Sequence, residues 1–132
     1  MPRNRLYYVQ EKDLWKDVLE LYRTNSFPET LAKNMEKMTY RIVKSRRFDS
    51  CSDLLREEMV SSAYARVCLK LYEKKFDPKH GSRVYSWATR VILNECLNVI
   101  AKEQRKTEQF RKYAEDYAAQ HQIEIVKEPD NY

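Results

Sequence analysis

The scarcity of chain-breaking residues limits what this sequence can fold into more than any other feature. Its 132 residues include one glycine, Gly81, and four prolines. Folds rich in β-sheet need many tight turns, which glycine and proline usually supply, so the composition argues against them. The apolar content of 42% is sufficient for a hydrophobic core in one domain. We therefore predict a compact, all-α domain.

Apolar residues at helical spacing predict four helices. The first covers about residues 10–23 and the second about residues 29–46. The third follows the capping side chains of residues 50–53 and runs to about residue 74. The fourth begins after the turn that contains Gly81, with Ser82 placed to cap it, and extends to about residue 120. We expect residues 1–121 to form a single domain and residues 122–132 a flexible tail.

The fourth predicted helix carries a tryptophan on its polar face. At about 100° per residue, one narrow stripe collects Arg83, Trp87, Arg90, Asn94, Asn98 and Arg105. The opposite arc is apolar and should face the core. Burial is the usual outcome for a helical tryptophan, but burying Trp87 would also draw cations inward at a large cost. We therefore expect an exposed Trp87, on a surface that stacks an unpaired base while cations hold the phosphates.

Charge is distributed unevenly along the chain, whose formal net charge is +5. Residues 49–58 hold four acids against one arginine, a local charge of −3, and residues 102–112 hold five bases against two acids, a local charge of +3. Surfaces of opposite sign suggest two partners, a nucleic acid and a basic protein. The alternative is that both segments are ordinary solvated helix surface.

Several function classes are disfavoured. The three cysteines are an odd number without paired spacing, which is typical of small buried side chains in a reducing cytosol. The two histidines, His80 and His121, lie far apart, so we expect no metal site. We find no catalytic set of residues and no phosphate-binding glycine loop, and we predict neither an enzyme nor a cofactor. The N-terminus has no apolar run long enough for a signal peptide or a membrane span.

Residues Asn34 to Gln104 resemble the second conserved region of bacterial sigma factors. The run Asp53-Leu-Leu-Arg-Glu57 is similar to the family's Asp-Leu-Ile-Gln-Glu, which docks on the coiled coil of the RNA polymerase β′ subunit. The segment from Phe76 to Thr89 is similar to the stretch that melts and captures the minus-ten promoter element. In this resemblance Trp87 stands at the aromatic position that stacks on the flipped-out adenine of the non-template strand.

The resemblance implies two sets of contact residues. Arginines and lysines would contact phosphates, and asparagines would reach base edges. The DNA-binding set is Trp87, Arg83, Arg90, Asn94, Asn98, Lys102, Arg105, Lys79 and Tyr85. The polymerase-binding set is Asp53, Arg56, Glu57, Leu54 and Met59.

A closer similarity, over about residues 5–113, is to the late-gene sigma factors of T-even-type phages. It implies a factor that gives the host polymerase, in the cytoplasm of an infected bacterium, a preference for a TATA-like late promoter. A coactivator or a sliding clamp is a further partner of such factors. The chain departs from the larger sigma factors at Arg90 and Val91, where they carry paired tryptophans, and at Arg56, where they carry glutamine. Its last ten residues match the clamp-binding tail poorly.

Two other functions fit the same sequence. One is a helical adaptor that binds RNA polymerase or RNA and never opens DNA, which would share the acidic segment and the basic helix. The other is a nonspecific single-strand binder, which would bind without polymerase and with a steep salt dependence. Base capture at Trp87 separates the sigma factor from the adaptor.

Overall fold

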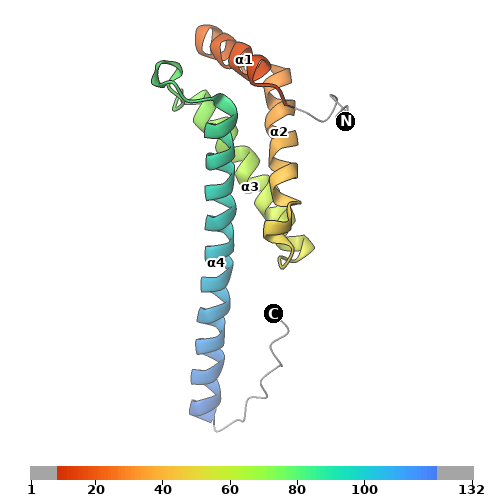
Figure 1. Ribbon diagram of the computed structural model, residues 1–132. Helices are drawn as coiled ribbons and strands as arrows, with labels where there is room; N and C mark the ends of the chain where they lie inside the picture. The colour runs from red at the N-terminus through yellow and green to blue at the C-terminus, as the bar shows by residue number, and fades with distance from the viewer. Residues whose placement is uncertain (1–8, 122–132) are drawn as a thin grey trace.

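The computed structural model describes residues 9–121, which form four α-helices and two short 3₁₀ segments (Figure 1). In chain order these are α1 (Glu11–Thr24), α2 (Glu29–Val43), η2 (Arg46–Phe48), α3 (Asp53–Tyr72), η3 (Pro78–His80) and α4 (Val84–His121). The predicted all-α fold with a long C-terminal helix is confirmed. The division into one domain and a tail stays a prediction, because residues 122–132 lie outside the described part.

Local chemistry explains where the helices begin and end. Asn25 adopts the left-handed conformation, with φ of 57°, and its backbone N–H closes α1 on the carbonyl of Leu21. The hydroxyl of Ser52 accepts a hydrogen bond from the backbone N–H of Leu55 and caps α3. Gly81 has φ of 80°, a conformation that favours glycine, and it turns the chain from η3 into α4.

The second helix ends at Val43, three residues before the predicted end. The chain turns instead into η2, which carries Phe48 into the core, where only 2% of the residue is exposed. Burial of an aromatic side chain outweighs continuation of the helix here. The predicted end of this helix was therefore wrong. The spacing of apolar residues does not show that the chain must turn after Val43 to bring Phe48 into the core.

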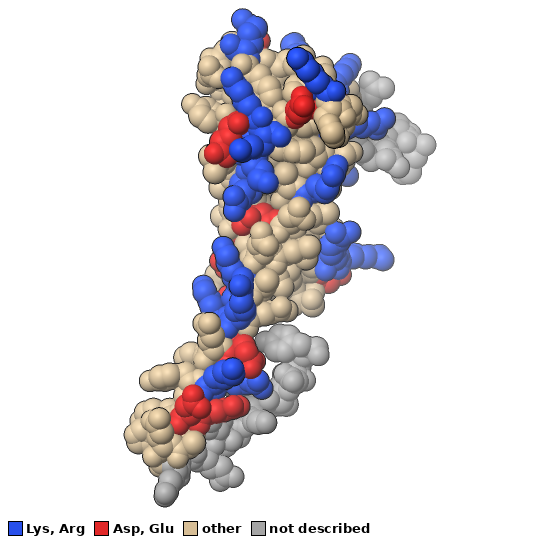
Figure 2. Space-filling view, turned by 90° about the vertical axis from the view of Figure 1, so that its left-hand side faces the viewer, with Lys and Arg blue, Asp and Glu red and all other residues tan. Residues whose placement is uncertain are grey.

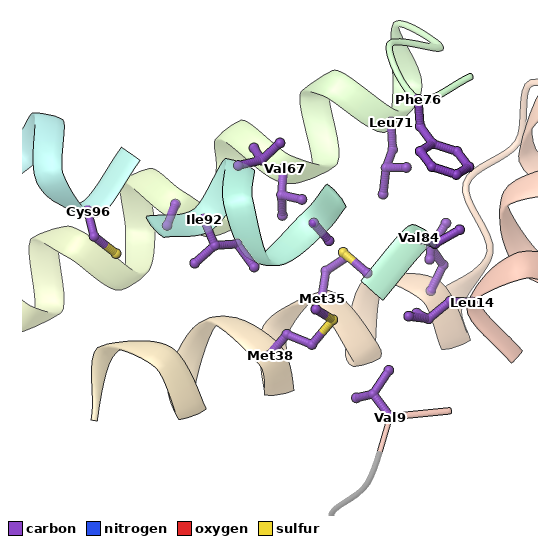
Figure 3. Packing of buried hydrophobic residues seen from close by; sticks show 14 of the residues in the cluster. Val9, Leu14, Met35, Met38, Val67, Leu71, Phe76, Val84, Ile92 and Cys96 are labelled. Atoms are coloured by element: carbon purple, nitrogen blue, oxygen red, sulfur yellow. The ribbon is translucent and has the colours of Figure 1, made fainter. Parts of the chain in front are cut away.

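All four helices contribute to one core. Leu14 from α1, Met35 from α2, Val67 from α3 and Ile92 from α4 point toward one another (Figure 3). Each is completely buried. The largest contact between helices is that of α3 with α4, so the helix with the predicted DNA-binding stripe is anchored firmly in the domain.

Two polar side chains are buried with partners. The hydroxyl of Thr39 donates to the carbonyl oxygen of Met35 at 2.8 Å. The carboxylate of Glu95, a residue only 7% exposed, accepts a hydrogen bond from Arg66 at 3.2 Å, which ties α4 to α3. Among residues 9–121, no buried side-chain nitrogen or oxygen lacks a hydrogen-bond partner. The core is therefore fully satisfied around the helix that carries the candidate site.

The second half of α4 extends past the ends of α2 and α3 (Figure 1). Beyond Val99, only Ala118 is buried among the described residues of this helix, while Phe110 and Tyr113 are largely exposed. With 38 residues, α4 is about 57 Å long at a rise of about 1.5 Å per residue. The helix therefore supports the domain with its first half and projects from it with its second.

Replacing Ile92 should show how much the core depends on α4. Ile92 is completely buried, so Ile92→Ala should lower the free energy of unfolding by about 2–5 kcal/mol. Leu97 lies on the same helix but is 52% exposed, and Leu97→Ala should change that free energy by less than about 1 kcal/mol. Urea unfolding of both variants measures the difference, and equal losses would contradict this packing.

Half-buried Cys68 and buried Cys96 should make the protein less stable at high pH. Burial raises the pKa of the Cys68 and Cys96 thiols from the ordinary 9.0 to about 11. The folded chain therefore favours the neutral thiols, and this contribution is complete below pH 9 and is lost as the pH rises from about 9 to about 11.

The rate of alkylation by iodoacetamide measures how far folding suppresses ionisation of the Cys68 and Cys96 thiols. At pH 8 the two thiols of the folded chain should react far more slowly than those of the urea-unfolded chain, because only about one in a thousand would be ionised. Equal rates in the two states would show that Cys68 and Cys96 are not shielded.

Candidate nucleic-acid interface

Trp87 lies one turn into α4 and is half-buried rather than fully exposed. Its ring meets the ring of Phe76 edge-on, with centroids 5.5 Å apart and planes at 60°. Phe76 is itself buried and meets Trp15 of α1 in the same manner at 6.1 Å. The expectation that Trp87 stands clear of the core was wrong, because a long helical side chain leans back toward the helix N-terminus. Here it reaches the buried ring of Phe76.

The cations beside Trp87 remain exposed, as expected. Arg83 precedes it by one turn and Arg90 follows it by one turn, and neither is drawn into the core. The remaining predicted positions on this side of the molecule are also exposed: Lys79 on η3, and Asn94, Asn98, Lys102 and Arg105 on α4. Viewed from the α4 side, Lys and Arg side chains recur along the length of the molecule (Figure 2). A braced aromatic ring between cations is suited to an unpaired base and its phosphates.

Tyr85 lies on the other flank of α4, two residues and about 200° of helix rotation from Trp87. It lines a separate groove of about 250 Å³ between α2 and α4, together with Thr89, Arg41 and Arg47. The structure therefore does not bring Tyr85 together with Trp87. The two arginines of this groove were not predicted, because only the packing of α2 and η2 beside α4 places them there.

The predicted polymerase contacts lie on the first turns of α3. Asp53, Leu54, Glu57 and Glu58 are exposed there, and we call these four residues the acidic ridge. Leu54 is 78% exposed, more than any other large apolar residue among residues 9–121. It lines a groove of about 560 Å³ between α3 and α4 whose walls include Leu55, Ile100 and Glu103.

Two other residues of the predicted polymerase-binding set, Met59 and Arg56, make contacts within the domain instead of facing solvent freely. Met59 is completely buried, so its assignment to the contact surface was wrong. It lies two residues after Glu57, about 200° around α3 from it, and packs into the core. Arg56 is half-buried and donates hydrogen bonds to the carbonyl oxygens of Phe48 and Asp49, at 3.2 and 3.1 Å. It holds the connection before α3 in place.

The N-terminus of α4 is capped from another helix. Ser82 was expected to cap it, but the carboxylate of Glu11 on α1 accepts hydrogen bonds from the backbone N–H groups of Val84 and Tyr85. A carboxylate at this end of a helix pairs with unsatisfied donors and with the positive end of the helix dipole. Sequence spacing gives no sign of this contact, because 73 residues separate Glu11 from Val84.

The groups that the candidate site offers are the ring of Trp87 and the exposed side chains of Arg83 and Arg90. Among residues 9–121, no group of three His, Cys, Asp or Glu side chains is placed to hold a metal ion. The thiols of Cys68 and Cys96 are shielded, since burial raises the pKa of each to about 11. None of the helices from α1 to α4 combines the length and the apolar character needed to cross a membrane.

Comparison with known proteins agrees with this geometry. A family described as sigma-70 region 2 matches residues 35–106, more than half of the 132-residue chain. The matched span covers most of α2, all of α3, the η3 turn and the half of α4 that carries Trp87. No curated protein matches the chain. The chain belongs to the sigma-70 region 2 family, a non-enzymatic module of sigma factors that binds core RNA polymerase and recognises the minus-ten promoter element.

Proposed function

We propose that this chain directs a bacterial host's core RNA polymerase to TATA-like minus-ten elements of late promoters, as a T-even-type phage late sigma factor does. The observation that carries its DNA-opening role is the placement of Trp87. Its ring is half-buried, braced by buried Phe76, and flanked by exposed Arg83 and Arg90. Support for the late-promoter assignment comes from the resemblance to the phage proteins over about residues 5–113.

The arrangement supports a two-stage capture of DNA. Exposed cations, including Arg83, Arg90 and Lys102, would first hold the phosphates and set the register without reading sequence. The pyrimidine–purine steps of a TATA-like element unstack most easily. An extruded base of the non-template strand would then stack on Trp87, a contact worth about 1–3 kcal/mol. Asn94 and Asn98 are exposed farther along α4, where they would hydrogen-bond base edges in the adjoining duplex.

Trp87 would act without the paired tryptophans of larger sigma factors. At those two positions the chain has Arg90, which is exposed, and Val91, which is buried. Only one of the two positions is therefore available to DNA, and it carries a cation in place of an apolar ring. A single braced ring beside a cation offers less apolar surface to the DNA than paired tryptophans would. It would therefore favour promoters whose first base pair opens easily.

The acidic ridge would hold the domain on polymerase. Asp53 and Glu57 stand four residues apart on one side of α3, and Leu54 projects beside them. An exposed apolar side chain framed by acids suits a basic helical partner, such as the β′ coiled coil. Leu54 would supply the buried contact, and the acids would supply attraction and register.

Replacing Trp87 tests base capture. Run-off transcription from a TATA-like promoter with bacterial core polymerase should fall about fivefold to a hundredfold in Trp87→Ala, the range expected for one lost base stack. Trp87→Tyr retains an aromatic ring and should keep most of the activity. Binding to core polymerase should be unchanged in both variants.

Two results would contradict base capture at Trp87. One is full run-off activity in Trp87→Ala. The other is no initiation by the native chain on duplex or pre-melted DNA despite demonstrated polymerase binding, which would favour the adaptor. Initiation that appears only after a phage coactivator or sliding clamp is added would identify that protein as a required partner.

Replacing Leu54 tests the polymerase contact. Leu54→Ala should weaken binding to core polymerase by about tenfold or more, because an apolar side chain at the centre of an interface contributes more than its surroundings. Leu69 is a matched control, since it is half exposed on the same helix but near its far end. Fluorescence anisotropy with labelled protein measures both affinities, and equal losses would move the contact away from the acidic ridge.

A further inference from the structure

Three side chains of α1 converge on the segment that contains Trp87. Glu11, Trp15 and Tyr22 are spaced so that they fall within about 40° of one another around the helix. All three contact residues between Phe76 and Tyr85. We call residues 76–87 the reading segment. All three α1 side chains lie outside the sigma-70 region 2 match, which begins at residue 35, after α1 has ended.

The contacts hold both ends of the reading segment. At its start, the hydroxyl of Tyr22 donates to the carbonyl oxygen of Phe76 at 2.7 Å, and the ring of Trp15 packs against the ring of Phe76. Burial raises the pKa of Tyr22, so its hydroxyl keeps the proton that it donates at neutral pH. Near its end, the carboxylate of Glu11 binds the first two N–H groups of α4. Between these points the chain turns through η3 and Gly81.

These constraints bear directly on Trp87. The ring of Trp87 packs on Phe76, which Trp15 and Tyr22 hold, and its backbone lies one turn beyond Val84, which Glu11 holds. The backbone N–H of Trp87 bonds to the carbonyl oxygen of Arg83, so the first turn of α4 sets the position of the ring. A ring that is fixed before DNA arrives loses less entropy when a base stacks on it.

We propose that α1 is a brace for the reading segment and that Glu11 is a positioning residue for base capture at Trp87. Glu11 acts through the backbone of Val84 and Tyr85 and does not touch DNA. The effect on base capture rests on the proposed function. The contacts of α1 with the reading segment are a property of the free chain and do not depend on that function. The two parts are tested separately.

Amide hydrogen exchange on the full chain tests the brace. The Val84 and Tyr85 amides should exchange about fivefold to tenfold faster in Glu11→Ala, because Glu11 is the acceptor of both among residues 9–121. Glu11→Gln keeps one acceptor oxygen and should give an intermediate rate. Asp13→Asn is the matched control, since Asp13 is an exposed acid in the same first turn of α1. It should leave both amides unchanged, and unchanged amides in Glu11→Ala would overturn the brace.

Transcription with core polymerase tests the consequence. Glu11→Ala should reduce initiation on duplex promoter DNA about fivefold to tenfold, with Glu11→Gln restoring part of it, while binding to polymerase stays within about twofold of native. Asp13→Asn removes the same charge and should initiate as the native chain does. A parallel fall in polymerase binding and initiation would show a merely structural role and overturn the positioning role. If the native chain opens no promoter, the proposed function fails and base capture with it, while amide exchange still decides the brace.

Discussion

Burial of the apolar arc of α4 against α3 determines which side of the longest helix meets solvent. Val84, Ala88, Ile92 and Cys96 have no exposed surface, and they fix the rotation of the helix about its axis. Arg83 and Arg90 must then face outward, and Trp87 must lie at the boundary between core and solvent. The Arg66–Glu95 pair adds a directional link between the two helices. A rotation of α4 large enough to bury Trp87 would expose this arc, so the candidate site is set by the core.

The position of Trp87 at that boundary would let a small domain offer a base-stacking surface. A fully buried ring would be closed to a base, and a fully exposed ring would be free to rotate. Contact with Phe76 holds the ring in place while part of its surface remains accessible. Phe76 in turn is held by Trp15 and Tyr22 of α1. The family match covers residues 35–106, and α1, which precedes that span, packs against it at Phe76.

Much of the fold could be predicted from sequence because the helical period is strong and turn residues are few. The same wheel that placed Val84 and Ile92 in the core also kept Arg83 and Arg90 outside, and both follow from spacing alone. A wheel of α3 would also have placed Met59 about 200° from Glu57, so that error was avoidable. Half-burial of Trp87 and the Glu11 cap could not be predicted, because each depends on a contact between segments far apart in the chain.

Coupling between Trp87 and a single DNA base tests the central claim most directly. Polymerase carrying either the native chain or Trp87→Ala would be bound to pre-melted promoter DNA, with an abasic site placed in turn at each non-template position. We predict that at one position the missing base weakens binding by about 1–3 kcal/mol for the native chain and has almost no effect for Trp87→Ala, because the two changes remove the same contact. Equal losses for both proteins at every position would contradict base capture by Trp87.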